Sequence, residues 1–290
     1  MYRIFLPFIT IIGLLLGSCS QKDTKSPEVL VSIPPYLYFI EALTEGQLKA
    51  VSLAPVGSNP HLYEPTPKQV QEAQKVHLWV RLNESFEKKI EKSLTEQNKS
   101  LIIANLAESS LIPFIYEDDM SCHCHECDST DRKDLHIWLS LKLAKTQADI
   151  IAAALIQAFP QHQALVEKNL LKLQEKLTEK DLLFTQLLAP YKNDAILVSH
   201  PAFSYFCRDY DIHQVAIESE GKDPRPQKLA ATLALAKELP IRTVLTQSQY
   251  NNKGAEIIAN KLGLPIHEVD PYSPNYLENL ELMTHYIVAP

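Results

Sequence analysis

Short runs of β-forming residues alternate with helical stretches along almost the whole chain, and this alternation restricts the possible fold more than any other feature. The expected strands are Val29–Ile33, Leu48–Leu53, Val76–Leu82 and Leu101–Leu106 in the first half, and Ala195–Ser199, His213–Ile217, Thr243–Thr246 and Ile266–Val269 in the second. Helical patterns fill the intervals, at Tyr36–Glu45, Lys68–Gln74, Ser85–Gln97, Phe203–Tyr210, Gln227–Leu239, Ala255–Leu262 and Tyr276–Val288. Alternating units of this size predict an α/β protein of two lobes, each with a parallel sheet flanked by helices.

The longest helical pattern in the chain separates the two halves. It starts after Pro160 and ends before Pro190, and roughly 28 residues at about 1.5 Å each would span about 40 Å. Leucines mark one face, at Leu165, Leu170, Leu173, Leu177, Leu183 and Leu187. We expect one rigid helix to join the lobes; a coiled-coil dimerisation arm is the alternative, but fewer than three clean heptads are present. The predicted organisation is a first lobe at 28–159, a linker helix at 160–190 and a second lobe at 191–290.

The composition excludes several classes of protein. Hydrophobic residues make up 46% and charged residues 22% of the 290 residues, with a mean hydropathy of -0.12, which fits neither a disordered chain nor a protein with several membrane spans. The formal net charge of -7 gives no reason to expect binding to nucleic acid. No GxxxxGKS/T, GxGxxG, GxSxG or HExxH motif occurs, so the usual signatures of phosphate loops, dinucleotide folds, serine hydrolases and zincins are absent from the sequence.

The N-terminus has the pattern of a targeting signal. Residues 1–18 contain one basic residue, Arg3, followed by a mainly apolar stretch that is too short to span a bilayer. The ending Leu16-Gly17-Ser18-Cys19 resembles a bacterial lipobox, in which the cysteine becomes the lipidated first residue; an ordinary secretory signal is the alternative. We therefore expect a signal peptide at 1–18, lipidation of Cys19, a flexible tether at 19–27, and a mature protein that faces an oxidising compartment while anchored to a membrane.

Four polar residues stand where ligands bind in open α/β sheets. His61 lies in a proline-rich loop after a strand, His136 just before a helix, His200 directly after a strand, and Asp270 at the end of the last strand. A single histidine in a loop is more often a solvated residue than a ligand, and Asp270 before Pro271 could instead be an ordinary turn residue. Their shared placement at the carboxyl ends of the sheets favours a common site.

The four side chains together suit a divalent metal ion. Three neutral imidazoles and one carboxylate would complete a tetrahedral shell around Zn²⁺. A complete shell argues against catalysis, since catalytic zinc keeps a position for water. Two ligands from each lobe would place the ion in the cleft between the lobes, where its binding stabilises the closed arrangement.

Several short motifs, taken in order, resemble one known family. They are the lipobox, N-P-H-x-Y-E-P around His61, H-I-W-L-S from His136, S-H-P-A-F-x-Y-F around His200, E-x-E-G-K-D-P-x-P from Glu218, and V-D-P around Asp270. The sequence after the tether is similar over nearly its whole length to the metal-binding lipoproteins of bacterial ABC importers, the zinc and manganese group of ZnuA/TroA-like substrate-binding proteins. The resemblance implies two α/β lobes joined by one long helix, with His61 and His136 as ligands from the first lobe and His200 and Asp270 from the second.

The same resemblance implies a function and partners. The chain would capture Zn²⁺ and pass it to a membrane permease driven by an ATPase subunit, as a monomer that faces the periplasm or the cell exterior. Manganese-preferring relatives often have Glu where this chain has His200, and imidazole favours zinc. Manganese or iron remains the alternative cargo, and a surface adhesin or a secreted metallohydrolase is an alternative function; no second carboxylate at a convincing spacing supports the hydrolase.

A loop rich in cysteine, histidine and acidic residues precedes His136. Its metal-binding side chains are Cys122, His123, Cys124, His125 and Cys127. Zinc-specific relatives carry a His- and acid-rich loop here, whereas this chain also uses Cys, a soft ligand that favours Zn²⁺ or Cu(I) over Mn²⁺. A disulfide, between Cys124 and Cys127 or from the loop to Cys207, is the alternative. Auxiliary metal binding and a structural or redox role stay equally open, as does a contribution of Glu218 or Glu220 to the main site.

Overall fold

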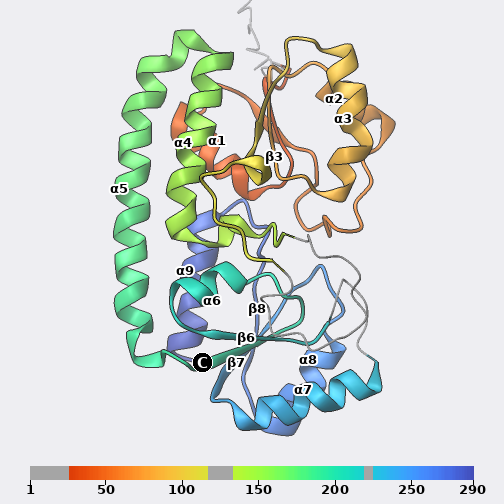
Figure 1. The fold of residues 1–290 in the computed structure, drawn as a ribbon, viewed down its shortest axis with the longest axis vertical. Helices are drawn as coiled ribbons and strands as arrows, with labels where there is room; N and C mark the ends of the chain where they lie inside the picture. Colours follow the sequence, from red (N-terminus) through yellow and green to blue (C-terminus); the bar gives the residue numbers. More distant parts are fainter. Residues whose placement is uncertain (1–25, 117–132, 219–224) are drawn as a thin grey trace, which may run out of the picture.

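Two parallel sheets form the two lobes of the protein. The computed structural model describes residues 26–116, 133–218 and 225–290. Within these ranges lie two four-stranded sheets, with strand orders β2-β1-β3-β4 and β6-β5-β7-β8, so each lobe repeats the same order relative to the chain. Figure 1 shows the first sheet and its helices in the upper lobe and the second in the lower lobe. The predicted fold class is confirmed.

The first lobe follows the predicted alternation closely. Its elements are β1 (Val29–Val31), α1 (Pro35–Thr44), β2 (Ala50–Ser52), α2 (Pro67–Ala73), β3 (Leu78–Arg81), α3 (Ser85–Gln97) and β4 (Ile102–Asn105). Every residue of β1 and β3 is buried, which is expected of parallel strands covered by helices on both faces. Short 3-10 turns, Leu106–Glu108 and Ile137–Leu139, follow before the next helix.

The second lobe is built in the same way. Its elements are β5 (Ala195–Val198), α6 (Ser204–Asp209), β6 (His213–Ala216), α7 (Pro226–Glu238), β7 (Ile241–Thr246), α8 (Lys253–Leu262), β8 (Ile266–Glu268) and α9 (Tyr276–Val288). Successive side chains of β5 point to opposite faces of the sheet. Ala195 and Leu197 belong to a small core with α7 and α8, while Ile196 and Val198 face the main core of the molecule.

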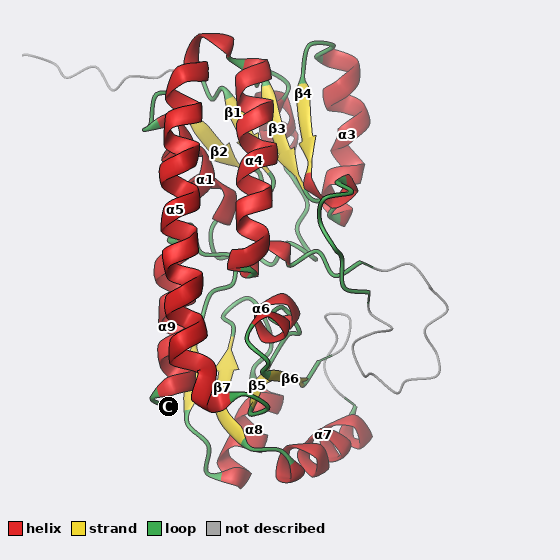
Figure 2. Cartoon of the chain, turned by 60° about the vertical axis from the view of Figure 1, so that its left-hand side comes forward, coloured by secondary structure: helices red, strands yellow, loops and turns green. Residues whose placement is uncertain are grey.

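A hairpin of two helices forms the side of the molecule, and its second helix runs along both lobes. Helix α4 (Leu141–Ala158) leads through the 3-10 turn Pro160–His162 into α5 (Gln163–Leu188), which ends at a second 3-10 turn, Ala189–Tyr191. The 26 residues of α5 span about 39 Å, and the helix packs against α1 and α4 in the first lobe and α9 in the second (Figure 2). The predicted joining helix is therefore present, with α4 beside it. Within the described ranges, no helix combines the length and apolarity needed to span a bilayer.

The buried face of α5 differs from the leucine face expected from the sequence. Leu173 and Leu177 are buried as predicted, but Leu183 and Leu187 are exposed, and Phe184 and Leu188 take their places. At about 3.6 residues per turn, positions 177, 184 and 188 stay on one stripe, whereas 183 and 187 fall beside it.

One apolar core runs through both lobes. It joins strand residues of the first sheet to Ile196 and Val198 of the second, and includes Leu173 and Phe184 on α5. Among the described residues, the separate apolar cluster lies on the face of the second sheet that α7 and α8 cover. The lobes are thus parts of one packed body, with the loops at the sheet ends meeting between them.

Candidate metal centre

The loop between β2 and α2 carries His61. At its far end, α2 starts with a capping box, in which Thr66 Oγ1 accepts from the Gln69 backbone and Gln69 Oε1 accepts from the Thr66 backbone. Nearer the histidine, Asn59 Oδ1 accepts from the His61 amide at 3.0 Å, and Asn59 Nδ2 donates to the carbonyl of Gln249 in the second lobe at 3.3 Å. These contacts hold the His61 loop against the second lobe.

His136 is held by a short turn that also reaches across to the second lobe. It is the N-cap of the 3-10 turn Ile137–Leu139, and its amide donates to Asp134 Oδ1 at 2.9 Å. Two residues on, the fully buried Trp138 packs beside the imidazole, and its Nε1 donates to the carbonyl of Pro271 at 2.7 Å. The position of His136 therefore depends on both lobes.

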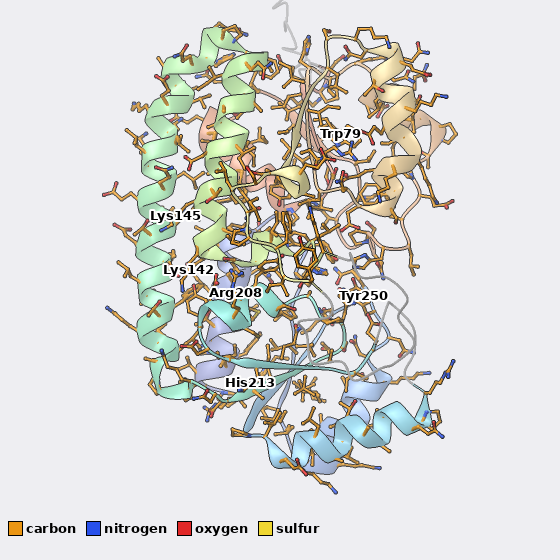
Figure 3. All side chains as sticks on the ribbon, viewed as in Figure 1. Trp79, Lys142, Lys145, Arg208, His213 and Tyr250 are labelled. Atoms are coloured by element: carbon orange, nitrogen blue, oxygen red, sulfur yellow. The ribbon has the colours of Figure 1, made fainter. Side chains whose placement is uncertain are left out.

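His200 comes directly from the second sheet, in the turn after β5. Its amide donates to Gln247 Oε1 at 2.7 Å, and Gln247 Nε2 donates back to its carbonyl at 3.2 Å. Its imidazole stacks on the ring of Tyr250, with centroids 4.2 Å apart and planes 7° from parallel. Tyr250 is labelled in Figure 3, between the two lobes. The ring of His200 is thus fixed both by its backbone and by a stacking partner.

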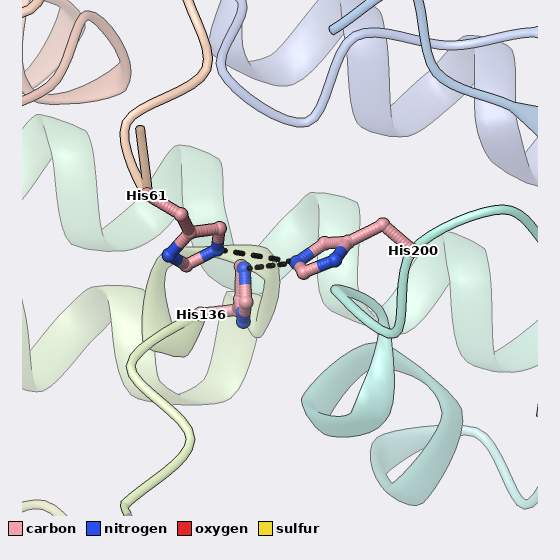
Figure 4. A group of neighbouring side chains, drawn as sticks. All are labelled: His61, His136 and His200. Atoms are coloured by element: carbon pink, nitrogen blue, oxygen red, sulfur yellow. Dashed lines mark hydrogen bonds between the residues drawn. The ribbon is translucent and has the colours of Figure 1, made fainter. Parts of the chain in front are cut away.

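The three imidazoles converge on one point (Figure 4). His200 Nε2 lies 3.2 Å from His61 Nε2 and 3.4 Å from His136 Nε2. Among the described His, Cys, Asp and Glu residues, these three are the group that offers ligand atoms all within 4.8 Å of one another. Nitrogen atoms this close, from both lobes, are arranged to share a cation.

A buried carboxylate lies beside the other ring nitrogen of each histidine. His136 Nδ1 is 2.7 Å from Asp134 Oδ1, and His200 Nδ1 is 2.5 Å from Glu218 Oε1. His61 Nδ1 is 3.6 Å from Glu84 Oε2, longer than a hydrogen bond. A carboxylate at Nδ1 favours the tautomer with the proton there, which leaves the Nε2 lone pair free for a metal. We assign Asp134 and Glu218 this orienting role, with Glu84 supplying charge nearby.

Burial and the three carboxylates shift the pKa values of two histidines in opposite directions. Burial lowers the pKa of His61, but the carboxylates, with Glu84 foremost, outweigh it, so its pKa lies above the ordinary value of 6.5. Burial lowers the pKa of His200 well below that value, and the neighbouring His136 and His61 lower it further. His200 is therefore neutral at neutral pH and able to bind a metal ion.

The structure does not bring Asp270 into this group. The residue follows β8 as expected, but its Oδ1 accepts from Gln249 Nε2 at 2.7 Å and from the Tyr272 amide at 2.9 Å. Instead, the hydroxyl of Tyr272 lies beside the Nε2 atoms of His136 and His61. The expectation that Asp270 completes the shell does not match this arrangement, because Asp270 is not in the group of ligand atoms and its Oδ1 bonds to Tyr272 in the same turn and to Gln249 in the loop after β7.

Several residues around the centre were not identified from the sequence. Asp134 precedes His136 by two positions and Tyr272 follows Asp270 by two, so each stands inside a motif already singled out. Glu84 and Tyr250 come from other loops, and no sequence signal points to them. The sequence leaves open a contribution of Glu218 to the metal shell, and the structure places its carboxylate instead at His200 Nδ1, the nitrogen that does not face the other histidines.

Some of the predicted functional residues lie outside the described part of the chain. They are Cys19, Glu220, and the loop residues Cys122, His123, Cys124, His125 and Cys127. Cys207 is a free, buried thiol on α6. The lipid anchor and the roles of the cysteine-rich loop stay predictions.

The family model of the periplasmic component A of zinc-uptake complexes (ZnuA) matches residues 29–289, which include both lobes and all three histidines. The chain belongs to the ZnuA family. The family predicted from the sequence is therefore confirmed.

Individual ZnuA proteins resemble the chain over most of its length. The high-affinity zinc uptake system protein ZnuA of Bacillus subtilis is 26% identical over 263 residues, which cover 86% of this chain and 82% of that protein. A crystal structure of ZnuA matches with a TM-score of 0.81 and 29% identity, covering 91% of this chain and 98% of the other. A 138–173 deletion mutant of ZnuA with zinc bound matches with a TM-score of 0.79 and 29% identity, covering 91% and 97%.

Proposed function

We propose that this protein is the extracytoplasmic receptor of an ABC importer, which captures one Zn²⁺ between its lobes and delivers it to the membrane permease. The convergence of the His61, His136 and His200 Nε2 atoms carries the proposal. Membership of the ZnuA family and the zinc-bound structure of a relative support it. An ATPase subunit of the same importer would drive transport through the permease.

The donor atoms favour zinc as the cargo. Three imidazole nitrogens suit Zn²⁺, whereas Mn²⁺ prefers a shell richer in oxygen. Two ligands from the first lobe and one from the second make binding dependent on both lobes. We propose binding rather than catalysis, because the family model that the chain matches describes a component of zinc-uptake complexes. Mn²⁺ remains the alternative cargo, because a fourth ligand that supplies oxygen would make the shell richer in the donor that Mn²⁺ prefers.

The location of the receptor is part of the same proposal. Cleavage after residue 18 and lipidation of Cys19 would hold a monomeric receptor at the outer face of the cytoplasmic membrane or in the periplasm. The cysteine- and histidine-rich loop before His136 would assist in gathering the ion. Each of these statements extends the sequence-based predictions.

A metal titration tests the central proposal. The metal-stripped full chain, titrated with Zn²⁺ against a competing chelator, should bind one tight equivalent. An anomalous-scattering map at the zinc edge should place that ion within about 2.1 Å of each of the three Nε2 atoms. Binding with no ion at this position would contradict the proposal.

Cell growth separates zinc from manganese more sharply than affinity does. Almost any site of nitrogen and oxygen donors binds Zn²⁺ more tightly than Mn²⁺, so an affinity ratio alone is not decisive. Cells that lack this receptor should grow poorly in zinc-limited medium and recover when zinc is added. Recovery with manganese but not with zinc would identify Mn²⁺ as the cargo.

The Glu218 carboxylate should strengthen zinc binding without touching the ion. In the Glu218→Gln variant the neutral amide stabilises the His200 Nδ1 proton less well, so we expect zinc affinity to fall by about 10- to 100-fold. Chelator competition measures the change. Glu238→Gln, the same substitution at an exposed residue of α7, is the matched control and should bind as the wild type does. Equal affinity in all three proteins would rule out the orienting role.

A further inference from the structure

The hydroxyl of Tyr272 lies where a fourth donor would stand beside the histidines. Tyr272 is fully buried, and its oxygen is 3.3 Å from His136 Nε2 and 3.4 Å from His61 Nε2. The oxygen is also 3.4 Å from the Tyr250 hydroxyl. Tyr272 belongs to the second lobe, while His61 and His136 belong to the first, so the tyrosine bridges the two lobes at the metal centre.

Four of the six distances between these atoms match the edges of a zinc shell. A regular tetrahedron whose corners lie about 2.0–2.1 Å from its centre has edges of about 3.3–3.4 Å. The two edges between histidine nitrogens measure 3.2 Å and 3.4 Å, and the two edges from the Tyr272 oxygen measure 3.3 Å and 3.4 Å. Four of the six edges of a tetrahedron are therefore present at the length that zinc requires.

We infer that the oxygen of Tyr272, rather than the carboxylate of Asp270, is the fourth ligand of the bound ion, as a phenolate whose proton is released to water when the ion binds. The inference rests on the proposed function of the site as a zinc receptor. It retains the expected two ligands from each lobe, namely His61 and His136 from the first and His200 and Tyr272 from the second. The inferred fourth ligand, Tyr272, is two positions after Asp270, the ligand expected from the sequence.

Asp270 then acts as a positioning residue for Tyr272. Its Oδ1 accepts from the Tyr272 amide at 2.9 Å and from the Gln249 side chain at 2.7 Å, and its own amide donates to Asn279 Oδ1 at 3.2 Å. These hydrogen bonds close the turn through which the chain presents the tyrosine ring. In this role the Asp270 carboxylate holds the turn, and the Tyr272 oxygen binds the metal.

The first lobe holds the ring of Tyr272 from the other side. The Trp138 ring packs against it, with centroids 5.3 Å apart, and Trp138 Nε1 donates to the Pro271 carbonyl at 2.7 Å. Ring and backbone are thus both fixed, which keeps the oxygen near the two histidines. A rigid oxygen donor needs little rearrangement to receive an ion.

A phenol at this corner also bears on the choice of ion. A carboxylate can bind through both oxygens and so raise the coordination number, which suits Mn²⁺, whereas a phenol offers one oxygen. Three nitrogens and one oxygen fit four-coordinate Zn²⁺. Tyr272 would therefore strengthen the preference for zinc that the histidines establish.

A crystal structure of the zinc-loaded wild-type protein gives the direct test. We expect the Tyr272 oxygen within about 2.0–2.2 Å of the ion and the Asp270 carboxylate outside bonding distance. A fourth position filled by Asp270 or by water, with the Tyr272 oxygen beyond about 3 Å, would overturn the inference. This measurement does not depend on the folding of any variant.

Variants give an independent test in solution. Tyr272→Phe should weaken zinc binding by at least about ten-fold, the lower end of the loss expected even for a residue that only supports a ligand. It should also change the visible spectrum of the Co²⁺-loaded protein, which reports the loss of one oxygen donor. Tyr210→Phe is the matched control, since it removes the hydroxyl of another buried tyrosine, one that contacts Asp181 on α5.

The outcomes separate this inference from the proposed function. If wild type and Tyr272→Phe bind zinc equally and give the same Co²⁺ spectrum, the fourth-ligand assignment is wrong while the receptor function stands. If Asp270→Asn loses more affinity than Tyr272→Phe and the spectrum changes only in Asp270→Asn, the carboxylate is the ligand. If the wild type binds no zinc, both proposals fail.

Discussion

Replacing His200 by Ala should weaken zinc binding by more than about 100-fold, beyond the loss expected for a residue that only orients a ligand. His200 is the one imidazole that the second lobe supplies, and its Nε2 lies within 3.4 Å of both other nitrogens. Removing it takes away a donor and also the link through which the ion holds the lobes together. His61→Ala and His136→Ala should have effects of the same order.

Chelator competition measures this loss, and a second histidine provides the control. His267, which stacks on Tyr286 and is not in the metal group, can be replaced by Ala in the same way. His267→Ala should keep wild-type zinc affinity. Thermal unfolding of both variants without metal shows whether each is folded. Binding by folded His200→Ala within ten-fold of the wild type would refute the ligand assignment.

Leu177→Ala should destabilise the protein by about 2–5 kcal/mol. Leu177 has no exposed surface and lies near the middle of α5, on the face that packs into the main core. The truncation removes apolar contacts and leaves a cavity that helices fixed on several sides cannot fill. Because α5 contacts both lobes, the loss should lower the stability of the whole molecule.

The same substitution at Leu171 isolates the effect of burial. Leu171 lies on the same helix but is 69% exposed, so Leu171→Ala should change the free energy of unfolding by no more than about 0.5 kcal/mol. Urea unfolding of wild type and both variants gives the comparison. Similar free energies of unfolding for the two variants would contradict the conclusion that the buried face of α5 stabilises the molecule.

Periodicity in the sequence predicts most of the fold because both sheets are parallel and covered by helices. The helices Ser85–Gln97 and Tyr276–Val288 begin and end where the pattern predicts. Most strands are shorter than the expected runs; β3, for example, covers Leu78–Arg81 within the expected Val76–Leu82. The exception is β7, which covers Ile241–Thr246 and so begins two residues before the expected Thr243–Thr246. Flanking residues such as Val76 and Leu82 are buried without pairing, and hydrophobicity alone cannot separate packing from strand pairing.

The candidate site could be predicted only as far as local motifs reach. His61, His136 and His200 each follow a recognisable strand end or precede a helix start, so their convergence follows from the topology of parallel sheets. The direction of Asp270 and Tyr272 depends on how the chain turns at Pro271, which periodicity does not specify. Glu84 is 23 positions from His61 in the sequence, and Glu218 is 18 positions from His200. Each carboxylate meets its histidine only after the chain has folded.

The continuous core across the lobes determines how a bound ion can leave. Since the lobes share one interior, we expect only small lobe movements and release of the ion through a small opening. The His61 side chain is 31% exposed, against 8% for His136 and 6% for His200, so water reaches the centre on the side of the β2–α2 loop. We therefore expect release to begin with movement of this loop and of His61, so that the residence time of the ion depends on this loop. The permease proposed above would act on this loop, where Val56 and Leu62 are exposed.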